Sequence, residues 1–475
     1  MVKLGSVIAT AAVAAVVLPG QTFTTLVRFD GAHGSLPTSG LMQGLDGSLY
    51  GTTNGGGPNY GGTVFSLALD STLTTVYGFA NNGKGNPSGG LLQTLSGEIF
   101  GTTPGDSLPA NPDGTIFELT VNGKFATLHT FNYSDGAHPS APLIEAINGD
   151  LYGTTIGEFD ANYYGSIFKI TPSGEFTNLH TFTGVDGSQP DSRLLQTADG
   201  YLYGTTPQGG STASGGAGGQ GTIFRITPAG EFTSLYSFCT APNCPDGAEP
   251  AGGLIEGPQG VFYGTTTAGG TSPTFDNGTV FKYQPGGSAV VIHNFCVAWP
   301  DCSDGSYPYG LVRGTDGNFY GVTAYGGTGG RYLGTVFRIT PDGKLTTLHT
   351  FCTQPGCPDG RYPAYTLLQA TDGNFYGVTT AGGNGDNGTI FRLNMGLAPF
   401  ITTVPTSCAP GRQVGIVGPE MAGSTSVTFN GRPAAFTVAS HHLILATVPA
   451  GATSGEVQVV TPQGVLRGNL PFIVR

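Results

Sequence analysis

Short apolar segments alternate with turn-forming residues through the first four hundred residues of the chain. Four segments make up each repeat, and the last full copy reads KLTTLHTF (344–351), YTLLQAT (365–371), NFYGVTT (374–380) and GTIFRLN (388–394). β-branched and aromatic residues dominate these segments, which favours strands. Asp-Gly or Asn-Gly dipeptides and TPxG sequences join neighbouring segments, and both are typical of tight hairpin turns. The pattern therefore predicts a four-stranded antiparallel meander in each repeat.

The predicted strands are apolar on both faces. Phe319 and Tyr320 are neighbours in one strand, and Ile390 and Phe391 are neighbours in another. Because successive side chains of a strand point to opposite faces, both faces of such a sheet must be covered. Sheets that stand around an axis, each packed between two others, meet this requirement.

The repeat occurs seven times, at intervals of 50 to 60 residues. Its copies are LYGTT (49), IFGTT (99), LYGTT (151), LYGTT (202), FYGTT (262), FYGVT (319) and FYGVT (375). Intervals near 50 residues are typical of kelch-like propeller blades. The array begins with a segment of the fourth kind, TTLVRF (24–29), and ends with one of the third kind, GTIFRLN. We therefore expect an all-β fold, a seven-bladed β-propeller closed by the N-terminal strand, which leaves no exposed sheet edge.

Two residues of the repeated motif are expected to serve packing. The glycine of YGTT would allow close backbone approach, and the second threonine would satisfy a recurrent hydrogen bond. These threonines are Thr53, Thr103, Thr155, Thr206, Thr266, Thr323 and Thr379. Since a site is usually added to a fold at one place, a residue repeated in every copy favours a structural role.

The long form of the motif, GL(L/V)Q-x-x-DGNFYGTT followed by GT(V/I)FRITP and TTLHTF, resembles the GloVer tandem repeat of bacterial extracytoplasmic proteins. The resemblance covers residues 23–395, and it implies an exported repeat protein without an assigned reaction. From Ala398 the sequence changes, and SVTFNG, ATVPAGATSG and EVQVVTPQG resemble an IPT/TIG domain, an immunoglobulin-like β-sandwich. The expected domains are a propeller at 21–396 and this module at 397–475.

The N-terminus and the composition bear on location. Residues 1–20 have one Lys followed by an apolar run, which fits a secretory signal peptide; a short membrane anchor or a misassigned start is the alternative. Only 10% of residues are charged and the net charge is −12, without a basic cluster, so nucleic acid is not an expected partner. We expect an extracytoplasmic protein, secreted or at the cell surface, without stable membrane insertion.

Six of the seven cysteines form close pairs in equivalent places of the repeat. The pairs are Cys239 with Cys244, Cys296 with Cys302, and Cys352 with Cys357. Local disulfides are the simplest interpretation for an exported chain. Zinc is the alternative, but it needs four converging ligands and no histidine adjoins these pairs. Cys408 is left over, as a buried or unpaired thiol.

Histidines occupy one repeated strand position, with tyrosine in two other copies. The residues are His129, His180, His293, His349, Tyr77 and Tyr236. Because this strand is the outer edge of each blade, the side chains would lie far apart, and packing is favoured over metal binding. His441 and His442 are expected on a strand of the C-terminal module. No catalytic motif, phosphate loop or calcium loop is present, so we predict no metal, no cofactor and no catalytic residues.

One variable position lies within a constant frame. The sequence D-G-x-x-P connects successive repeats, and the residue before Pro varies. The predicted ligand-binding residues are these, with Trp299 from a cysteine loop on the same face: His138, Gln189, Glu249, Trp299, Tyr307 and Tyr362. A constant frame that presents varied polar and aromatic side chains suits a binding face.

The expected function is therefore that of a non-enzymatic binding protein. It would be a monomer that recognises a glycan or protein ligand through the loop face of the propeller. Ordinary loop variation explains the variable position equally well. A structural envelope scaffold, and a polysaccharide hydrolase or lyase at the channel mouth, are the alternatives, since two distant carboxylates could still meet there.

Overall fold

The computed structural model describes residues 20–475, except 82–84, 106–112, 158–163, 212–218, 272–276, 298–300 and 329–332. The described part is built from β-strands, with two single-turn 3-10 helices at Pro258–Gly260 (η1) and Asn384–Asp386 (η2). None of its helices has the length and apolar character needed to cross a bilayer. The predicted signal peptide lies, apart from Gly20, outside the described residues.

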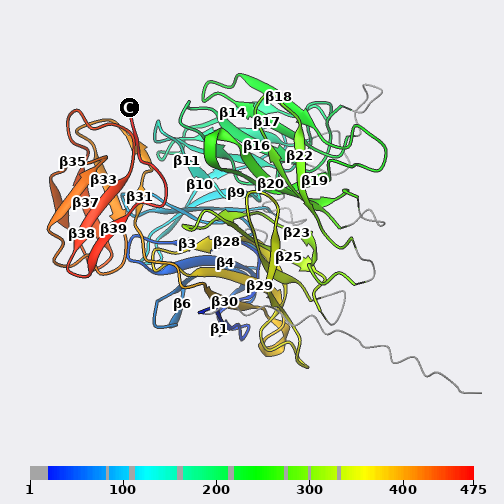
Figure 1. The fold of residues 1–475 in the computed structure, drawn as a ribbon, viewed down its shortest axis with the longest axis horizontal. Coiled ribbons are helices and arrows are strands. Elements are labelled where there is room, and N and C mark those ends of the chain that lie inside the picture. The colour runs from blue at the N-terminus through cyan, green and yellow to red at the C-terminus, as the bar shows by residue number, and fades with distance from the viewer. Residues whose placement is uncertain are drawn as a thin grey trace, which may run out of the picture.

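Seven antiparallel sheets follow one another along the described chain, and we number them in that order (Figure 1). Sheet 1 contains β2 (Ser35–Pro37), β3 (Met42–Gln43), β4 (Leu49–Gly55), β5 (Tyr60–Leu67) and β6 (Leu73–Ala80). Sheet 2 contains β7 (Leu92–Gln93), β8 (Ile99–Thr103), β9 (Thr115–Leu119) and β10 (Phe125–Thr130). Sheet 3 contains β11 (Ile144–Glu145), β12 (Leu151–Thr155), β13 (Ser166–Ile170) and β14 (Phe176–Thr181).

The remaining sheets of the array repeat this order. Sheet 4 contains β15 (Leu195–Gln196), β16 (Leu202–Thr206), β17 (Thr222–Ile226) and β18 (Phe232–Ser237). Sheet 5 contains β19 (Ala248–Glu256), β20 (Phe262–Ala268), β21 (Thr279–Tyr283) and β22 (Ala289–Asn294). Sheet 6 contains β23 (Ser306–Pro308), β24 (Val312–Arg313), β25 (Phe319–Tyr325), β26 (Thr335–Ile339) and β27 (Leu345–Thr350). Sheet 7 contains β28 (Arg361–Gln369), β29 (Phe375–Ala381), β30 (Thr389–Asn394) and, from the start of the chain, β1 (Thr22–Arg28).

Strand β1 supplies the fourth strand of sheet 7. It pairs antiparallel with β30, with Thr22 opposite Asn394 and Arg28 opposite Thr389, and one irregularity after Thr25. The first and last strands of the array therefore lie side by side (Figure 1).

The first strand of most sheets is shorter than the sequence pattern suggests. It is nine residues long in β19 and β28 but two residues long in β7, β11 and β15. In β28 the pairing with β29 is irregular between Ala364 and Leu368, which marks a bulge within this strand. In β19 the pairing with β20 is irregular at the same place, between Ala251 and Ile255.

Apolar clusters join each sheet to the next. In the described residues one cluster combines Tyr50 and Val64 of sheet 1 with Phe117 of sheet 2, and five equivalent clusters continue to sheet 7. A seventh combines Phe65 of sheet 1 with Ile390 of sheet 7. The apolar faces of sheets 1 and 7 are therefore buried against each other as well, which satisfies the two-sided burial expected from the sequence.

The repeated glycine makes room for an aromatic ring. A Cβ atom at Gly153 would lie 2.6 Å from Cζ of Phe168 and 2.7 Å from Cδ2 of Leu143. The same overlap with the phenylalanine ring, at 2.4–2.6 Å, recurs at Gly51, Gly101, Gly204, Gly264, Gly321 and Gly377. The expectation of close backbone approach was wrong, because the neighbour is a side chain from the next strand.

The repeated threonine hydrogen-bonds across the sheet. Thr379 Oγ1 lies 2.8 Å from Thr389 Oγ1 and accepts the backbone N–H of Thr389 at 3.1 Å. Equivalent hydroxyl pairs, 2.7–2.9 Å apart, occur in the other six sheets, with serine as one partner in sheet 3. The predicted recurrent hydrogen bond is present in every copy, and it satisfies buried hydroxyls that would otherwise destabilise the fold.

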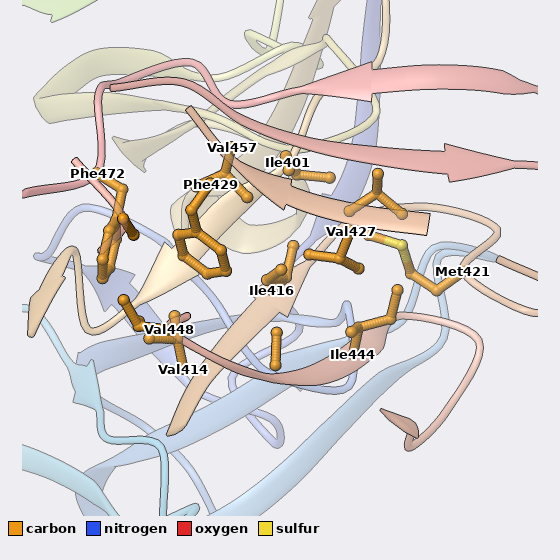
Figure 2. Close-up of a cluster of buried hydrophobic side chains, with 13 residues drawn as sticks. Ile401, Val414, Ile416, Met421, Val427, Phe429, Ile444, Val448, Val457 and Phe472 are labelled. Carbon is orange, nitrogen blue, oxygen red and sulfur yellow. The ribbon is translucent and has the colours of Figure 1, made fainter. Parts of the chain in front are cut away.

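The C-terminal residues form further sheets. One sheet contains β31 (Thr402–Val404), β33 (Gln413–Val417), β37 (Leu443–Thr447) and β36 (Phe436–Val438), and another β35 (Arg432–Pro433), β34 (Ser426–Phe429), β38 (Val457–Thr461) and β39 (Gly464–Arg467). Strands β32 (Ser407–Cys408) and β40 (Ile473–Val474) pair in parallel. Side chains from the two larger sheets, including Ile416, Ile444, Val427 and Phe429, meet in one buried core (Figure 2).

These C-terminal sheets contact the hairpin turns of the array. Phe400 donates its N–H to the carbonyl of Thr371 at 2.9 Å. A Cβ at Gly47 would lie 2.6 Å from the His442 ring, so the two turns pack closely. The expectation that His441 and His442 lie on a strand was wrong, since both belong to the turn before β37. Two neighbouring polar side chains are tolerated there because turn residues, unlike strand residues, do not point alternately to opposite faces of a sheet.

Candidate functional site: the loop face

The residue before proline has the same unusual backbone conformation in every D-G-x-x-P position and in the two related corners of sheets 1 and 2. Its φ is positive throughout: Leu36 54°, Asn86 61°, His138 56°, Gln189 59°, Glu249 56°, Tyr307 60° and Tyr362 54°. Positive φ is uncommon for residues other than glycine and costs free energy, so the surrounding contacts must hold it in place.

Contacts with the preceding sheet hold this corner. The N–H of Glu249 donates to the carbonyl of Gln220 at 2.8 Å, and the N–H of Leu36 donates to that of Asn387 at 3.0 Å. The following proline ring is buried against a glycine: a Cβ at Gly221 would lie 2.4 Å from Cδ of Pro250. The frame predicted to present binding residues is thus also a joint between successive sheets, including sheets 7 and 1.

The side chains on this frame have different surroundings. All five that the structure describes among the predicted binding residues are half-buried. His138 Nδ1 donates to the carbonyl of Pro104 at 2.6 Å, and Thr267 donates its hydroxyl to Glu249 at 3.1 Å. For Gln189 the structure gives the backbone bond to Tyr164 at 2.8 Å. Trp299 lies outside the described residues.

Two of the predicted residues meet around a tyrosine that sequence reasoning missed. The Tyr325 ring lies edge-on to Tyr307, with centroids 5.4 Å apart, and edge-on to Tyr362, at 5.7 Å. The guanidinium of Arg361 lies 5.1 Å from the Tyr362 centroid and forms an ion pair of 2.6 Å with Asp386. We call Tyr307, Tyr325 and Tyr362 the tyrosine cluster. Its signal in the sequence was an aromatic residue where sheets 5 and 7 have alanine, at Ala268 and Ala381.

The segments around the first strands of several sheets approach one another. A Cβ at Gly310 would lie 2.7 Å from the carbonyl oxygen of Gly252, and one at Gly252 would lie 2.2 Å from Cα of Gly310. A Cβ at Gly253 would lie 2.8 Å from the carbonyl of Arg193. Glycine is required at these positions because neighbouring backbones lie so close.

Four large or charged side chains lie in these segments: Asp191, Arg193, Tyr309 and Tyr365. Asp191 and Arg193 are both exposed. The rings of Tyr309 and Tyr365 are stacked, with centroids 6.1 Å apart and planes 19° from parallel.

Burial changes the acidity of these groups. Desolvation raises the pKa of Asp191 to about 6, and its own backbone N–H opposes the shift. Desolvation also raises the pKa of Tyr309 and of Tyr365, and the negative charge of Asp191 raises both further. The carboxylate therefore lies within electrostatic reach of both phenols. The sequence signal was PDSRL (190–194), where other repeats have small residues such as PAGGL (250–254).

Each repeated histidine contacts the aspartate of the D-G-x-x-P frame that follows it in the chain. His180 Nε2 lies 3.0 Å from Asp186, and its ring stacks on Phe232 of the next sheet. His293 and His349 contact Asp304 and Asp359 in the same way. Among the described residues, no three His, Cys, Asp or Glu side chains gather into a group that could hold a metal ion. Each of these histidines thus joins an outer strand to the Asp of the D-G-x-x-P frame.

Disulfides lie beside three of these aspartates. The bonded pairs are Cys239–Cys244, Cys296–Cys302 and Cys352–Cys357. The N–H of Cys352 donates to Asp359 at 3.0 Å, so the disulfide loop leads directly into the frame. Cys408 is a half-buried free thiol, and burial raises its pKa.

Comparison with known proteins gives a family and a fold. The model of the Gloeobacter/Verrucomicrobia repeat matches residues 5–213 and 273–414. Among curated proteins no sequence matches the chain. The extracellular domain of a B. thetaiotaomicron protein described as a hybrid two component system is similar in fold, with 10% identity and a TM-score of 0.50. The similarity covers 84% of this chain but 46% of that one, so this chain spans about half its length.

Other solved structures are more distant. A protein from Dyadobacter fermentans shares 11% identity over 79% of this chain and 99% of its own, with a TM-score of 0.44. A gluconolactonase from Xanthomonas campestris shares 15% identity over 79% of this chain and 89% of its own, with a TM-score of 0.39. Similarity at this level carries no functional argument.

Proposed function

This chain belongs to the Gloeobacter/Verrucomicrobia repeat family, and from that premise we propose that it is an extracytoplasmic, non-enzymatic binding protein. Its ligand, a glycan, is recognised through the loop face of the array. The observation that carries this proposal is the tyrosine cluster, in which Tyr325 brings together two variable residues from successive sheets, Tyr307 and Tyr362.

The proposed scaffold is a closed seven-bladed β-propeller followed by an immunoglobulin-like IPT/TIG module. The pairing of β1 with β30 supports closure. So does a second joint: Gln43 of sheet 1 accepts the N–H of Thr371 of sheet 7 at 2.9 Å, as Gln93 of sheet 2 accepts that of Leu45 at 2.8 Å. The core shared by the two C-terminal sheets supports a sandwich.

The extracytoplasmic location rests on three observations. Three disulfides are typical of chains that fold in an oxidising compartment. The apolar N-terminal segment fits an export signal. The most similar fold described above belongs to an extracellular domain.

A glycan suits the tyrosine cluster for a chemical reason. Aromatic rings offer apolar faces for the C–H groups of a sugar, and phenol hydroxyls exchange hydrogen bonds with its hydroxyls. The nearby Arg361 adds a fixed donor. Flat aromatic residues also lose little conformational entropy on binding, which favours them in recognition surfaces.

A glycan array probed with the full chain tests the proposal, followed by titration calorimetry on any hit. Tyr325→Ala is expected to weaken binding at least about tenfold, the loss of about 1.4 kcal/mol. Leu69→Ala, which removes an exposed apolar side chain from the turn between β5 and β6, serves as the control and should leave affinity unchanged. Binding that survives Tyr325→Ala, or no binding to any glycan by a folded chain, would overturn the proposal.

A further inference from the structure

We propose that the C-terminal module, residues 397–475, is a brace that holds the two ends of the repeat array together. The module follows β30 in the chain, yet it contacts sheets 1 and 2, which follow β1. No covalent bond joins β1 directly to β30, and we call their pairing the seam. The brace is independent of ligand binding, because its contacts lie at turns that follow the first strands, whereas the D-G-x-x-P corners of the loop face precede those strands.

The same nine residues occur in two sheets with different burial. TDGNFYGVT forms the first hairpin turn and most of the second strand in sheet 6 (315–323) and again in sheet 7 (371–379). Thr315 is exposed, whereas the equivalent Thr371 is only 3% exposed. Since the two segments are identical, the difference arises from what lies against them. Another part of the chain covers the turn of sheet 7.

Sheet 7, sheet 1 and the C-terminal module meet at Thr371. Its N–H donates to Oε1 of Gln43 in sheet 1 at 2.9 Å, and its carbonyl accepts the N–H of Phe400 at 2.9 Å. A Cβ at Gly373 would lie 2.4 Å from the carbonyl oxygen of Leu397. The Leu397 side chain also packs against the apolar cluster between sheets 6 and 7. The start of the module is therefore fixed on sheet 7.

The body of the module contacts the equivalent turns of sheets 1 and 2. A Cβ at Gly47 of sheet 1 would lie 2.6 Å from Cγ of His442. A Cβ at Gly415 of the module would lie 2.7 Å from Cδ1 of Leu95, in the turn of sheet 2. Figure 1 shows the C-terminal strands, in orange and red, beside the blue strands of sheet 1. The module thus touches the turns of sheets 7, 1 and 2.

The turn glycine is covered only in the two sheets that adjoin the seam. At Gly47 and Gly373 an added Cβ would overlap the module, but at the equivalent glycines of the other five sheets it would have no described atom within 4 Å beyond its chain neighbours: Gly97, Gly149, Gly200, Gly260 and Gly317. If β1 separated from β30 and sheets 1 and 2 moved with it, the module contacts would have to break as well. They therefore add to the free energy of opening the seam.

Hydrogen exchange in full-chain variants tests the brace. Gly47→Ala would place a methyl carbon against Cγ of His442, which is too near the His442 backbone for the ring to swing away freely. Gly149→Ala is the matched control, because both glycines have a φ of 83° and alanine is equally strained at each. The slowest-exchanging amides of β1 should exchange at least about tenfold faster in Gly47→Ala than in Gly149→Ala. Amides of β18, an outer strand far from the seam in the chain, should exchange equally in both.

A second pair of variants repeats the comparison within identical sequence. Gly373→Ala and Gly317→Ala change the same position of TDGNFYGVT, where φ is 87° and 81°. Gly373→Ala should accelerate exchange in β1, and Gly317→Ala should not. Leu95→Ala, which shortens the side chain that reaches Gly415 without backbone strain, should accelerate it too. Equal exchange of β1 within both glycine pairs, or acceleration in β18 as large as that in β1, would overturn the brace.

Discussion

The ring of Phe23 lies flat on the imidazole of His349, with centroids 3.6 Å apart and planes 6° from parallel. Phe23 lies on β1 and His349 on β27, so the contact joins the two ends of the array. His129 and Phe176 make the same contact between sheets 2 and 3, at 4.0 Å and 2°. The start of the chain thus occupies the place that the fourth strand has in other sheets.

Because the two contacts are equivalent, two substitutions are expected to destabilise the protein to a similar degree. Phe23→Ala and Phe176→Ala should lower the free energy of unfolding by similar amounts, about 2–4 kcal/mol each, because each removes a ring from the same kind of contact. Thermal unfolding followed by circular dichroism measures the difference. A fully stable Phe23→Ala protein beside an unstable Phe176→Ala protein would show that β1 does not complete sheet 7.

The overlap between Gly153 and Phe168 predicts a strained core on adding one methyl group. Gly153→Ala should destabilise the fold by about 1–3 kcal/mol, since the new Cβ would lie 2.6 Å from the ring. Phe168→Leu shortens the neighbour and should recover part of that loss in the double variant. Calorimetric melting of the two single variants and the double variant completes the double-mutant cycle. If the losses of unfolding free energy in the single variants simply add in the double variant, the steric explanation is contradicted.

The disulfides predict a redox-dependent stability. Replacing Cys352 and Cys357 together by serine should cost about 2 kcal/mol, because the bond closes a short loop and restricts the unfolded chain. Melting under oxidising conditions should show the loss. Under a thiol reductant, the variant and the wild-type protein should be closer in stability, and a gap of unchanged size would contradict this origin.

Asp191 predicts that part of the stability is lost as the pH rises. Its folded pKa, about 6, is above its unfolded value near 3.8, so the folded state binds the proton more tightly. The corresponding stability is present below pH 3.8 and is lost as the pH rises through 6. Asp191→Asn should therefore melt higher than the wild-type protein at pH 7.5, by about 1–2 °C, and no higher at pH 4.

His129 predicts the opposite dependence. Desolvation lowers its pKa, although Asp135 opposes the shift, so the folded state favours the neutral ring. The stability that this residue contributes is present above its ordinary pKa of 6.5 and is lost as the pH falls below that value. His129→Phe keeps an aromatic ring on Phe176 and should flatten the fall in melting temperature between pH 7 and pH 5. An unchanged slope would contradict the assignment.

Much of the fold could be predicted because the same pattern of strands and turns occurs seven times along the chain. The paired apolar residues, such as Ile390 and Phe391, required sheets covered on both faces, and the threonine hydrogen bonds followed from repetition. The shortened first strands could not be predicted, because the local pattern carries no signal for the place where pairing with the second strand breaks. The candidate site was predicted in part: the D-G-x-x-P frame indicated Tyr307 and Tyr362, but Tyr325 comes from a different strand.

Local pattern determined the strands, the turns, the number of repeats and the cysteine pairs, because each depends on residues near one another in the chain. The tertiary structure decided which side chains share a space. Asp191, Tyr309 and Tyr365 come from three different repeats. In the sequence, each stands where other repeats have a small residue. The rings of Tyr309 and Tyr365 stack only because neighbouring sheets bring their first strands together, which no local interaction encodes.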